Sequence, residues 1–244
     1  FEERLGAFLN VPAVATVPMC RTGIYLAVKH LIRPGQDVVM SPYTIADVVN
    51  MVILAGGRPV FADIERANCN IRVDTVERLL HAGTGAVLVT HLHGIAAPIQ
   101  EICDLCGPKG IPVIEDTAQA FGAKVRGRRL GTYGDVGVFS FGMYKNINTW
   151  YGGAVTCKDP GLFSAIANES DSLPFQKRSL VINRMREGLM TDVATHPFLF
   201  RSLTFWIFRF GRLHDIRWIN RFVETELDLS RLEAMPEKYL GKMT

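Results

Sequence analysis

The sequence lacks the features that mark several classes of protein. Its 244 residues contain no internal repeat, no low-complexity tract and no signal peptide. The formal net charge is only +3, and no basic run interleaved with aromatic residues precedes residue 201, which argues against a nucleic-acid partner. With 48% hydrophobic residues, the chain can bury a full core as one large domain or two small ones.

Cysteine is scarce and irregularly placed. The five cysteines are an odd number without regular spacing, which predicts reduced thiols in a cytoplasmic protein. Cys103 and Cys106 have the spacing of a redox motif, but they follow a segment with helical periodicity, and no second pair completes a zinc site. We therefore predict two helix cysteines at the edge of the core.

An initiator methionine is also absent. The chain begins at Phe1 with a pattern typical of the middle of an amphipathic helix, and it ends at Thr244 without a helix-ending signal or a polar tail. We expect it to be a fragment of a longer protein, trimmed at both ends.

Short apolar runs alternate with helical periodicity through residues 1–160. The runs are predicted strands at 13–17, 37–40, 59–61, 86–89, 113–114, 136–141 and 153–157. Helices are predicted between most of them, at 23–31, 44–55, 73–82 and 99–106. Buried strands separated by helices predict an α/β fold with a mainly parallel sheet and helices on both faces.

The composition shifts after residue 160. Strand signals disappear, and residues 161–244 have the pattern of helix and loop. We therefore predict an α/β large domain over residues 1–160 and a helical region over 161–244. In parallel sheets, ligands bind at the carboxyl ends of the strands, where chemically useful side chains are to be sought.

Three side chains follow two neighbouring predicted strands at those ends. Asp116 lies two residues after the strand at 113–114, Ser140 is next to the last residue of the strand at 136–141, and Lys145 comes five residues after Ser140. A carboxylate for a pyridinium nitrogen, a hydroxyl for a phosphate and an amine for a Schiff base are the groups that pyridoxal phosphate requires. Taken alone, Lys145 is more typical of a surface lysine and Asp116 of a helix N-cap; it is their combination that favours the site. Glu115 points to the other face and receives no role.

A phosphate position is predicted upstream. Thr22 and Gly23 follow the first predicted strand and precede a helix, and backbone amides at such a helix N-terminus bind anions. Many helices begin this way, so the signal is weak by itself. Together with Ser140, it predicts a phosphate cup built from two segments.

With these residues the sequence resembles the DegT/DnrJ/EryC1/StrS family of sugar aminotransferases over about residues 1–160. Residues 90–94 (Thr-His-Leu-His-Gly) resemble the family's V-H-L-Y-G, and residues 115–122 resemble E-D-A-A-Q-A-x-G. The segment 134–145 resembles the G-D and S-F-x-x-x-K signature, and residues 41–44 and 55–64 resemble the stretch from the second strand to the third. The order and spacing of these motifs agree.

The resemblance implies a fold type I pyridoxal phosphate enzyme, with residues 1–160 as the cofactor-binding large domain. Lys145 would carry the cofactor and move the proton, Asp116 would pair with the pyridinium, and Gln119 would lie by the phenolic oxygen. Ser140, with the amides of Thr22 and Gly23, would hold the phosphate. The implied reaction transfers an amino group from L-glutamate to a keto-sugar, usually nucleotide-linked, in polysaccharide or secondary-metabolite biosynthesis. A homodimer is implied, and the family's small C-terminal domain is missing after residues 161–244.

Three positions depart from the family pattern. Arg21 stands where the family has glycine, Ile45 where it has an aromatic residue that stacks on the cofactor, and Tyr151 where it has a carboxylate. Ile45 would then pack on the cofactor ring. These changes keep open a degenerate, non-catalytic binding or regulatory protein. Related sugar dehydratases are a further alternative, but they carry histidine at the position of Lys145.

Residues 198–222 combine aromatic residues with arginines. The stretch is too short and too charged to span a bilayer, and it predicts an amphipathic helix whose arginine side chains extend toward water. Two interpretations stay open: the helix packs on the sheet or the missing domain, or it contacts a membrane surface. The second places a cytoplasmic enzyme at the membrane.

Overall fold

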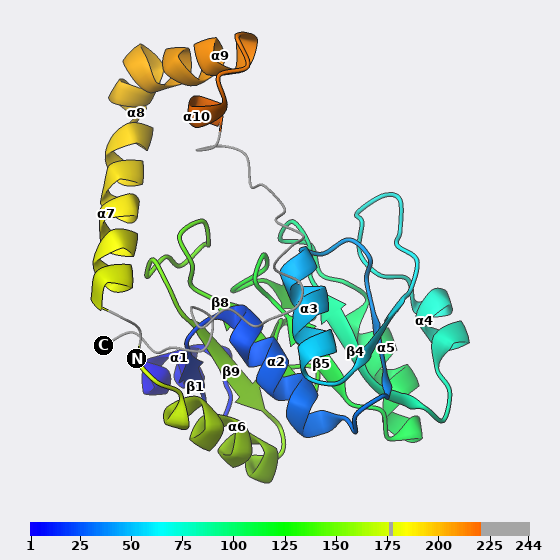
Figure 1. The fold of residues 1–244 in the computed structure, drawn as a ribbon. Coiled ribbons are helices and arrows are strands. Elements are labelled where there is room, and N and C mark those ends of the chain that lie inside the picture. Colours follow the sequence, from blue (N-terminus) through cyan, green and yellow to red (C-terminus); the bar gives the residue numbers. More distant parts are fainter. Residues whose placement is uncertain (176–177, 221–244) are drawn as a thin grey trace. The chain divides into compact units, whose positions relative to one another are not determined.

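The described residues form two compact units. The computed structural model describes residues 1–175 and 178–220, and the contacts among them divide the chain between these two ranges. Figure 1 shows the sheet and its helices in the first unit and a series of helices in the second. Each unit is considered by itself below.

The first unit is built on one seven-stranded sheet. Its strands run in the order β1-β9-β8-β5-β4-β2-β3. Every pair from β8 to β3 is parallel, whereas β9 runs antiparallel to both β8 and β1. This confirms the predicted mainly parallel sheet. The strands are β1 (Ala15–Val17), β2 (Asp37–Met40), β3 (Arg58–Phe61), β4 (Thr84–Thr90), β5 (Val113–Asp116), β8 (Val136–Ser140) and β9 (Gly153–Cys157).

Helices cover both faces of this sheet, which is why the central strands are continuous apolar runs instead of alternating patterns. One face packs against α2, α3 and α6, and the other against α4 and α5, with α1 beside the β8–β9 end. The six helices are α1 (Glu2–Leu9), α2 (Cys20–Leu31), α3 (Ala46–Leu54), α4 (Val73–Leu79), α5 (Ile99–Cys106) and α6 (Pro160–Ser172), and a 3-10 turn, η1 (Gly107–Lys109), follows α5.

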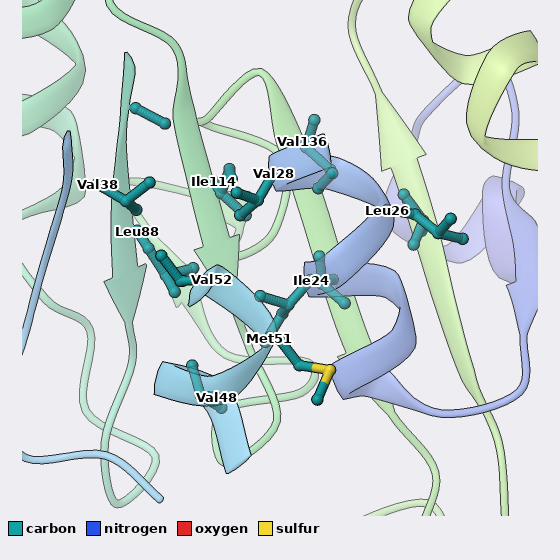
Figure 2. Packing of buried hydrophobic residues seen from close by; sticks show 14 of the residues in the cluster. Ile24, Leu26, Val28, Val38, Val48, Met51, Val52, Leu88, Ile114 and Val136 are labelled. Carbon is teal, nitrogen blue, oxygen red and sulfur yellow. The ribbon is translucent and has the colours of Figure 1, made fainter. Parts of the chain in front are cut away.

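The core between the sheet and helices α2 and α3 holds the site in place. Figure 2 shows side chains of α2, such as Ile24, and of α3, such as Met51, packed against Leu88, Ile114 and Val136 from the strands. All five are at most 1% exposed. Because both helices are fixed by this packing, their N-termini have defined positions at the carboxyl edge of the sheet.

The structure adds elements that the sequence patterns did not predict. Residues 124–129 form a small hairpin, β6 (Lys124–Val125) with β7 (Arg128–Arg129). Arg126 and Gly127 connect the two strands with positive φ angles of 47° and 82°, as a two-residue hairpin turn requires. The prediction for Cys103 and Cys106 is confirmed: both are free thiols on α5.

Helix α6 belongs with the sheet. Its Ile166 lies in the core beside α2, and Lys29 of α2 donates to Glu169 at 2.6 Å. Ser170 donates to the Thr16 carbonyl of β1 at 3.3 Å. The domain boundary after residue 160 stays a prediction; the contacts extend the first unit to Phe175.

The described part of the second unit consists of helices joined by short turns. It comprises α7 (Arg178–Thr195), α8 (Pro197–Leu199), a π-helical turn η2 (Phe200–Thr204), α9 (Phe205–Leu213) and α10 (Arg217–Asn220). Residues 221–222 of the predicted amphipathic stretch lie outside the described residues. Within 1–175 and 178–220, none of the helices has the length and hydrophobicity that a membrane span needs.

Candidate functional site

The predicted side chains meet at the carboxyl edge of the parallel strands. Asp116 is the last residue of β5 and lies opposite Val138 of β8, so that Ser140 is two residues further along the neighbouring strand. Ser140 in turn lies opposite Gly153 of β9. Met19, which precedes α2, forms a bridge with Gly152. The start of α2 therefore lies beside the ends of β5, β8 and β9.

Two glycines permit this close approach. A Cβ atom on Gly23 would lie 2.8 Å from side-chain carbons of both Val138 and Val155, and one on Gly153 would lie 2.7 Å from the backbone nitrogen of Cys20. Carbon atoms do not pack at such distances without displacement of their neighbours. Glycine at these two positions thus allows the first turn of α2 to rest directly on β8 and β9.

The Asp116 carboxylate is deeply buried and only partly satisfied. The residue is 3% exposed, and its Oδ1 atom accepts the Ala118 N–H at 2.9 Å. The Cys20 thiol lies 3.7 Å from the same oxygen. In the described ranges no donor reaches Oδ2. Residues 118–122 form turns, so the helix N-cap interpretation of Asp116 is wrong: no helix begins there.

The charge of Asp116 is opposed by burial and supported by its neighbours. Burial raises the pKa of this carboxyl, and the Ala118 N–H, the Lys145 ammonium, His91 and the Cys20 thiol act in the lowering direction without cancelling the effect. A buried carboxylate with one oxygen open to a donor is suited to a cationic N–H ligand.

Lys145 lies in the loop that follows β8. Its residue is half-buried, and its backbone N–H donates to the Gly142 carbonyl at 3.1 Å. The positive charge of its side chain lowers the pKa values of both Asp116 and Cys20. The structure therefore brings Lys145 and Asp116 into one electrostatic environment, although they are far apart along the chain.

Behind this edge lies a buried pair that the sequence patterns did not single out. His91 Nδ1 accepts the Ala97 N–H at 3.1 Å, so the proton is on Nε2, which donates to Glu115 at 3.0 Å. The Glu115 carboxylate also accepts the N–H groups of Gly131 and Gly134. Glu115 thus faces away from Asp116, as the strand alternation predicted, and ties together the loops that precede β8 and follow β4.

Gln119 and Ser140 occupy positions around Asp116. Gln119 Oε1 accepts the His93 N–H at 3.1 Å, which fixes its amide against the loop after β4. Ser140 is half-buried at the end of β8, and its hydroxyl forms no hydrogen bond with the rest of the described chain. The Gln119 amide therefore has a defined position, and the Ser140 hydroxyl can donate to a ligand.

The α2 side of the site differs in detail from the prediction. The helix begins at Cys20, three residues before the predicted start, and the Gly23 N–H donates to the Met19 carbonyl at 3.1 Å. Thr22 is fully buried in the first turn. Gly23 therefore contributes to the site chiefly by its lack of a side chain. The backbone amides of the first turn that could bind an anion belong to the residues before it.

The N-termini of α2 and α3 are linked by an ion pair. Arg21 on the first turn of α2 donates to the carboxylate of Asp47 on the first turn of α3. Ile45, the N-cap residue of α3, is 57% exposed. The side chain of Arg21 is thus held toward α3, and Ile45 presents an apolar surface next to this pair.

No metal centre accompanies these residues. Within the described part of the chain, no three His, Cys, Asp or Glu side chains are grouped closely enough to hold an ion. The arrangement offers a buried carboxylate, a lysine, a serine hydroxyl and a helix N-terminus, which together suit a cationic ring that bears a phosphate.

Comparison with known proteins gives a consistent result. The sequence model of the DegT/DnrJ/EryC1/StrS aminotransferase family matches residues 1–172. A GDP-perosamine synthase from Vibrio cholerae is 38% identical over 156 residues, which are 64% of this chain and 42% of that protein. A dTDP-4-dehydro-2,3,6-trideoxy-D-glucose 4-aminotransferase from Saccharopolyspora spinosa is 36% identical over 140 residues, 57% of this chain and 36% of that protein.

Solved structures show the same similarity. The aminotransferase TlmJ from Streptoalloteichus hindustanus is 35% identical with a TM-score of 0.66, over 68% of this chain and 46% of that one. The chain thus spans less than half the length of each of these relatives.

Proposed function

Because the chain belongs to the DegT/DnrJ/EryC1/StrS aminotransferase family, we propose that the protein is a pyridoxal phosphate-dependent sugar aminotransferase. It takes an amino group from L-glutamate and transfers it to a keto-sugar, which we propose to be nucleotide-linked. The observation that carries the proposal is the buried Asp116 carboxylate, with one oxygen open to a donor and the charge of Lys145 close by.

The residues fit the cofactor. The Oδ2 atom of Asp116 would accept the N–H of a pyridinium, whose positive charge would support this buried carboxylate together with the charge of Lys145. When bound, pyridoxal phosphate supplies an aldehyde for the amino group and a ring that withdraws electrons from the reacting carbon. Asp116 keeps the ring nitrogen protonated, which is the state that withdraws electrons best.

Each remaining residue has a proposed role in binding or proton movement. Lys145 holds the cofactor through its amine and moves the proton at the reacting carbon. Gln119 lies by the phenolic oxygen, and the Ser140 hydroxyl binds the phosphate. Thr22 in the first turn of α2 completes the phosphate cup, and Gly23, whose N–H is bound to the Met19 carbonyl, lets that turn lie close to the strand ends. Ile45 packs against the ring from the N-terminus of α3.

A homodimer is proposed as the active form. Several apolar side chains near the site are exposed, among them Ile45 at 57% and Tyr144 at 81%. A partner subunit that covers this edge would exclude water from the reacting groups. Light scattering of the full-length protein measures the molecular mass; a monomer that turns over glutamate and a keto-sugar would contradict the proposal.

The decisive experiment concerns the cofactor. The full-length protein with pyridoxal phosphate is expected to give a visible absorption band that bleaches with L-glutamate, and borohydride reduction followed by peptide mapping is expected to find the cofactor on Lys145. Lys145→Ala abolishes the band, whereas the exposed control Lys124→Ala keeps it. A panel of keto-sugar nucleotides then identifies the acceptor by restoring the band.

The outcome also separates the alternatives. A band that persists in L-glutamate and in other amino donors would favour a non-catalytic binding protein with the substitutions at Arg21, Ile45 and Tyr151. No band, or an adduct on another lysine, would show that these substitutions have abolished the cofactor site. Lys145 itself stands against the dehydratase interpretation.

For the second unit we propose peripheral contact with an anionic membrane surface from the cytoplasmic side. Leu203, Trp206, Phe210 and Leu213 follow a spacing of three and four residues, which puts them on one helical face, and each is more than half exposed. No acidic residue occurs between positions 196 and 214. The exposed basic side chains beside this face are Arg201, Arg209, Arg212 and Arg217.

Apolar insertion and basic side chains together suit a bilayer with anionic headgroups. Flotation of the full-length protein is expected with vesicles that contain phosphatidylserine and not with pure phosphatidylcholine. Phe210→Ser weakens flotation, while Met190→Ser on α7 is the control outside this face. The membrane contact would be refuted if the full-length protein did not float with anionic vesicles, or if it formed a dimer in which Trp206 is buried.

A further inference from the structure

Cys20, the first residue of α2, brings its thiol against Asp116. The Sγ atom lies 3.7 Å from Oδ1, within hydrogen-bonding range for sulfur. The thiol is the donor, because an ionised carboxylate only accepts. The Ala118 N–H donates to the same oxygen at 2.9 Å from the turn that follows β5. Two segments of the chain therefore hold one oxygen of the carboxylate.

This arrangement fixes the carboxylate plane. With Oδ1 held by two donors, rotation of the side chain would break one of them, and Oδ2 is left as the acceptor for a ligand. In the described ranges, Oδ2 has no donor of its own, although the residue is only 3% exposed. The charge of Lys145 acts on both Asp116 and Cys20, so the thiol belongs to the site.

Burial and the neighbouring carboxylate keep the thiol protonated. Burial and the Asp116 carboxylate raise the pKa of the Cys20 thiol well above its usual value, while Lys145 from the loop after β8 and Arg21 from α2 act against this. On the carboxylate side, Lys145 and His91 from the loop after β4 favour the ionised form. With its pKa raised in this way, the thiol keeps the proton that it donates to the carboxylate.

We propose that Cys20 is a positioning residue of the cofactor site. By donating its S–H to Oδ1, it orients Asp116 so that Oδ2 receives the N–H of the cofactor's pyridine ring. The residue touches the carboxylate and acts on the cofactor through it. This role rests on the proposed function, whereas the contact between Cys20 and Asp116 is independent of it.

The contact is tested without cofactor. The alkylation rate of Cys20 by iodoacetamide is measured against pH by mass spectrometry in the wild type, in Asp116→Asn and in Asp135→Asn. Asp116→Asn removes the negative charge beside the thiol, so its profile is expected to shift to lower pH. Asp135→Asn, which changes a carboxylate that accepts the Val113 N–H at the other end of the parallel strands, should leave the profile in place. Identical profiles in all three proteins would overturn the contact.

The positioning role is tested by cofactor titration, followed through the visible band over a range of pH. Cys20→Ala is expected to weaken binding by about threefold to tenfold, the worth of one hydrogen bond. The loss of cofactor binding at low pH should extend to higher pH in Cys20→Ala than in the wild type, because Asp116 ionises less readily without the thiol. Cys20→Ser restores a donor and should bind within about twofold of the wild type. Cys157→Ala, a buried thiol at the far end of β9, is the control for loss of sulfur.

The outcomes are distinguishable. If Cys20→Ala bound the cofactor with the affinity and pH profile of the wild type, the positioning role alone would be defeated. It would also be defeated if Cys20→Ser bound the cofactor as weakly as Cys20→Ala, since packing of sulfur would then be the cause. A wild-type protein without any band defeats the proposed function and the positioning role with it.

Discussion

Replacement of Asp116 by asparagine should stabilise the cofactor-free protein. Burial raises the pKa of this carboxyl in the folded state, so the folded protein holds the proton more tightly than the unfolded chain does. As pH rises from the unfolded pKa of about 3.9 through the raised folded value, the free energy of unfolding falls. Above that window the penalty is fully present. Asparagine keeps an oxygen for the Ala118 N–H but carries no charge to desolvate.

The expected magnitude is that of a single stabilising substitution. Such substitutions typically add about 0.5–2 kcal/mol to the free energy of unfolding, and we expect a gain in that range for Asp116→Asn at neutral pH. For a chain of this size it corresponds to a rise in Tm of roughly 1–8 °C. The gain should shrink as the pH falls toward the unfolded pKa of about 3.9, because the carboxyl then takes up a proton in both the folded and the unfolded protein.

Differential scanning calorimetry of the cofactor-free protein at both pH values measures these shifts. Asp135→Asn is the matched control: its carboxylate also accepts a backbone N–H, but it is half-exposed and should show no gain. With saturating pyridoxal phosphate, the wild type should become more stable than Asp116→Asn, because the wild type binds the cofactor more tightly. A cofactor-free Asp116→Asn protein less stable than the wild type at neutral pH would refute the reasoning, since Asp116 would then be a satisfied ion.

Three further outcomes are expected. Gly23→Ala should lower the free energy of unfolding in urea by about 1–3 kcal/mol, because its Cβ overpacks the α2–sheet contact; Gly107→Ala, which meets nothing within 4 Å, should not. Glu115→Ala should cost about 3–5 kcal/mol in the same assay, because it leaves His91 and two backbone N–H groups buried without an acceptor; a loss under 1 kcal/mol would mean that water replaces the carboxylate. Burial raises the pKa values of three thiols, Cys103, Cys106 and Cys157, to about 12, 11 and 12. Alkylation of these thiols near pH 8 should therefore be slow until the protein is unfolded, and fast labelling of the folded protein would contradict their burial.

The sheet was predictable because its strands are covered on both faces. Continuous apolar runs such as Ala86 to Val89 are required when neither face meets water, and helices with apolar periodicity separate most of them. Seven predicted strands correspond to the seven strands of the sheet. The hairpin at 124–129 was missed because its strands are two residues long and three of their four residues are basic, so they carry no alternating pattern.

The site was less predictable in its details. Helix α2 begins at Cys20 instead of at Gly23, because its first turn is fixed by contact with Gly153 and the strand ends and carries no apolar periodicity. That shift brings the Cys20 thiol to Asp116, a contact that no spacing in the sequence records. The partnership of His91 with Glu115 was invisible for the same reason: two residues from different strand ends meet only in the fold.

The substitution at Arg21 is matched by its surroundings. Its side chain is half-buried and paired with Asp47, so the cation at the position where the resemblance leads us to expect glycine comes with a carboxylate on the next helix. The pair draws the guanidinium toward the start of α3 and leaves Gly23 and Gly153 free to maintain the close approach of α2 to the strand ends. Burial outweighs the groups that support the charge of Asp116, so a site that had lost its ligand would be more stable with an amide or an apolar residue at this position. The cost of keeping that carboxylate buried is the structural argument for a cationic ligand, and it favours a working cofactor site over a degenerate one.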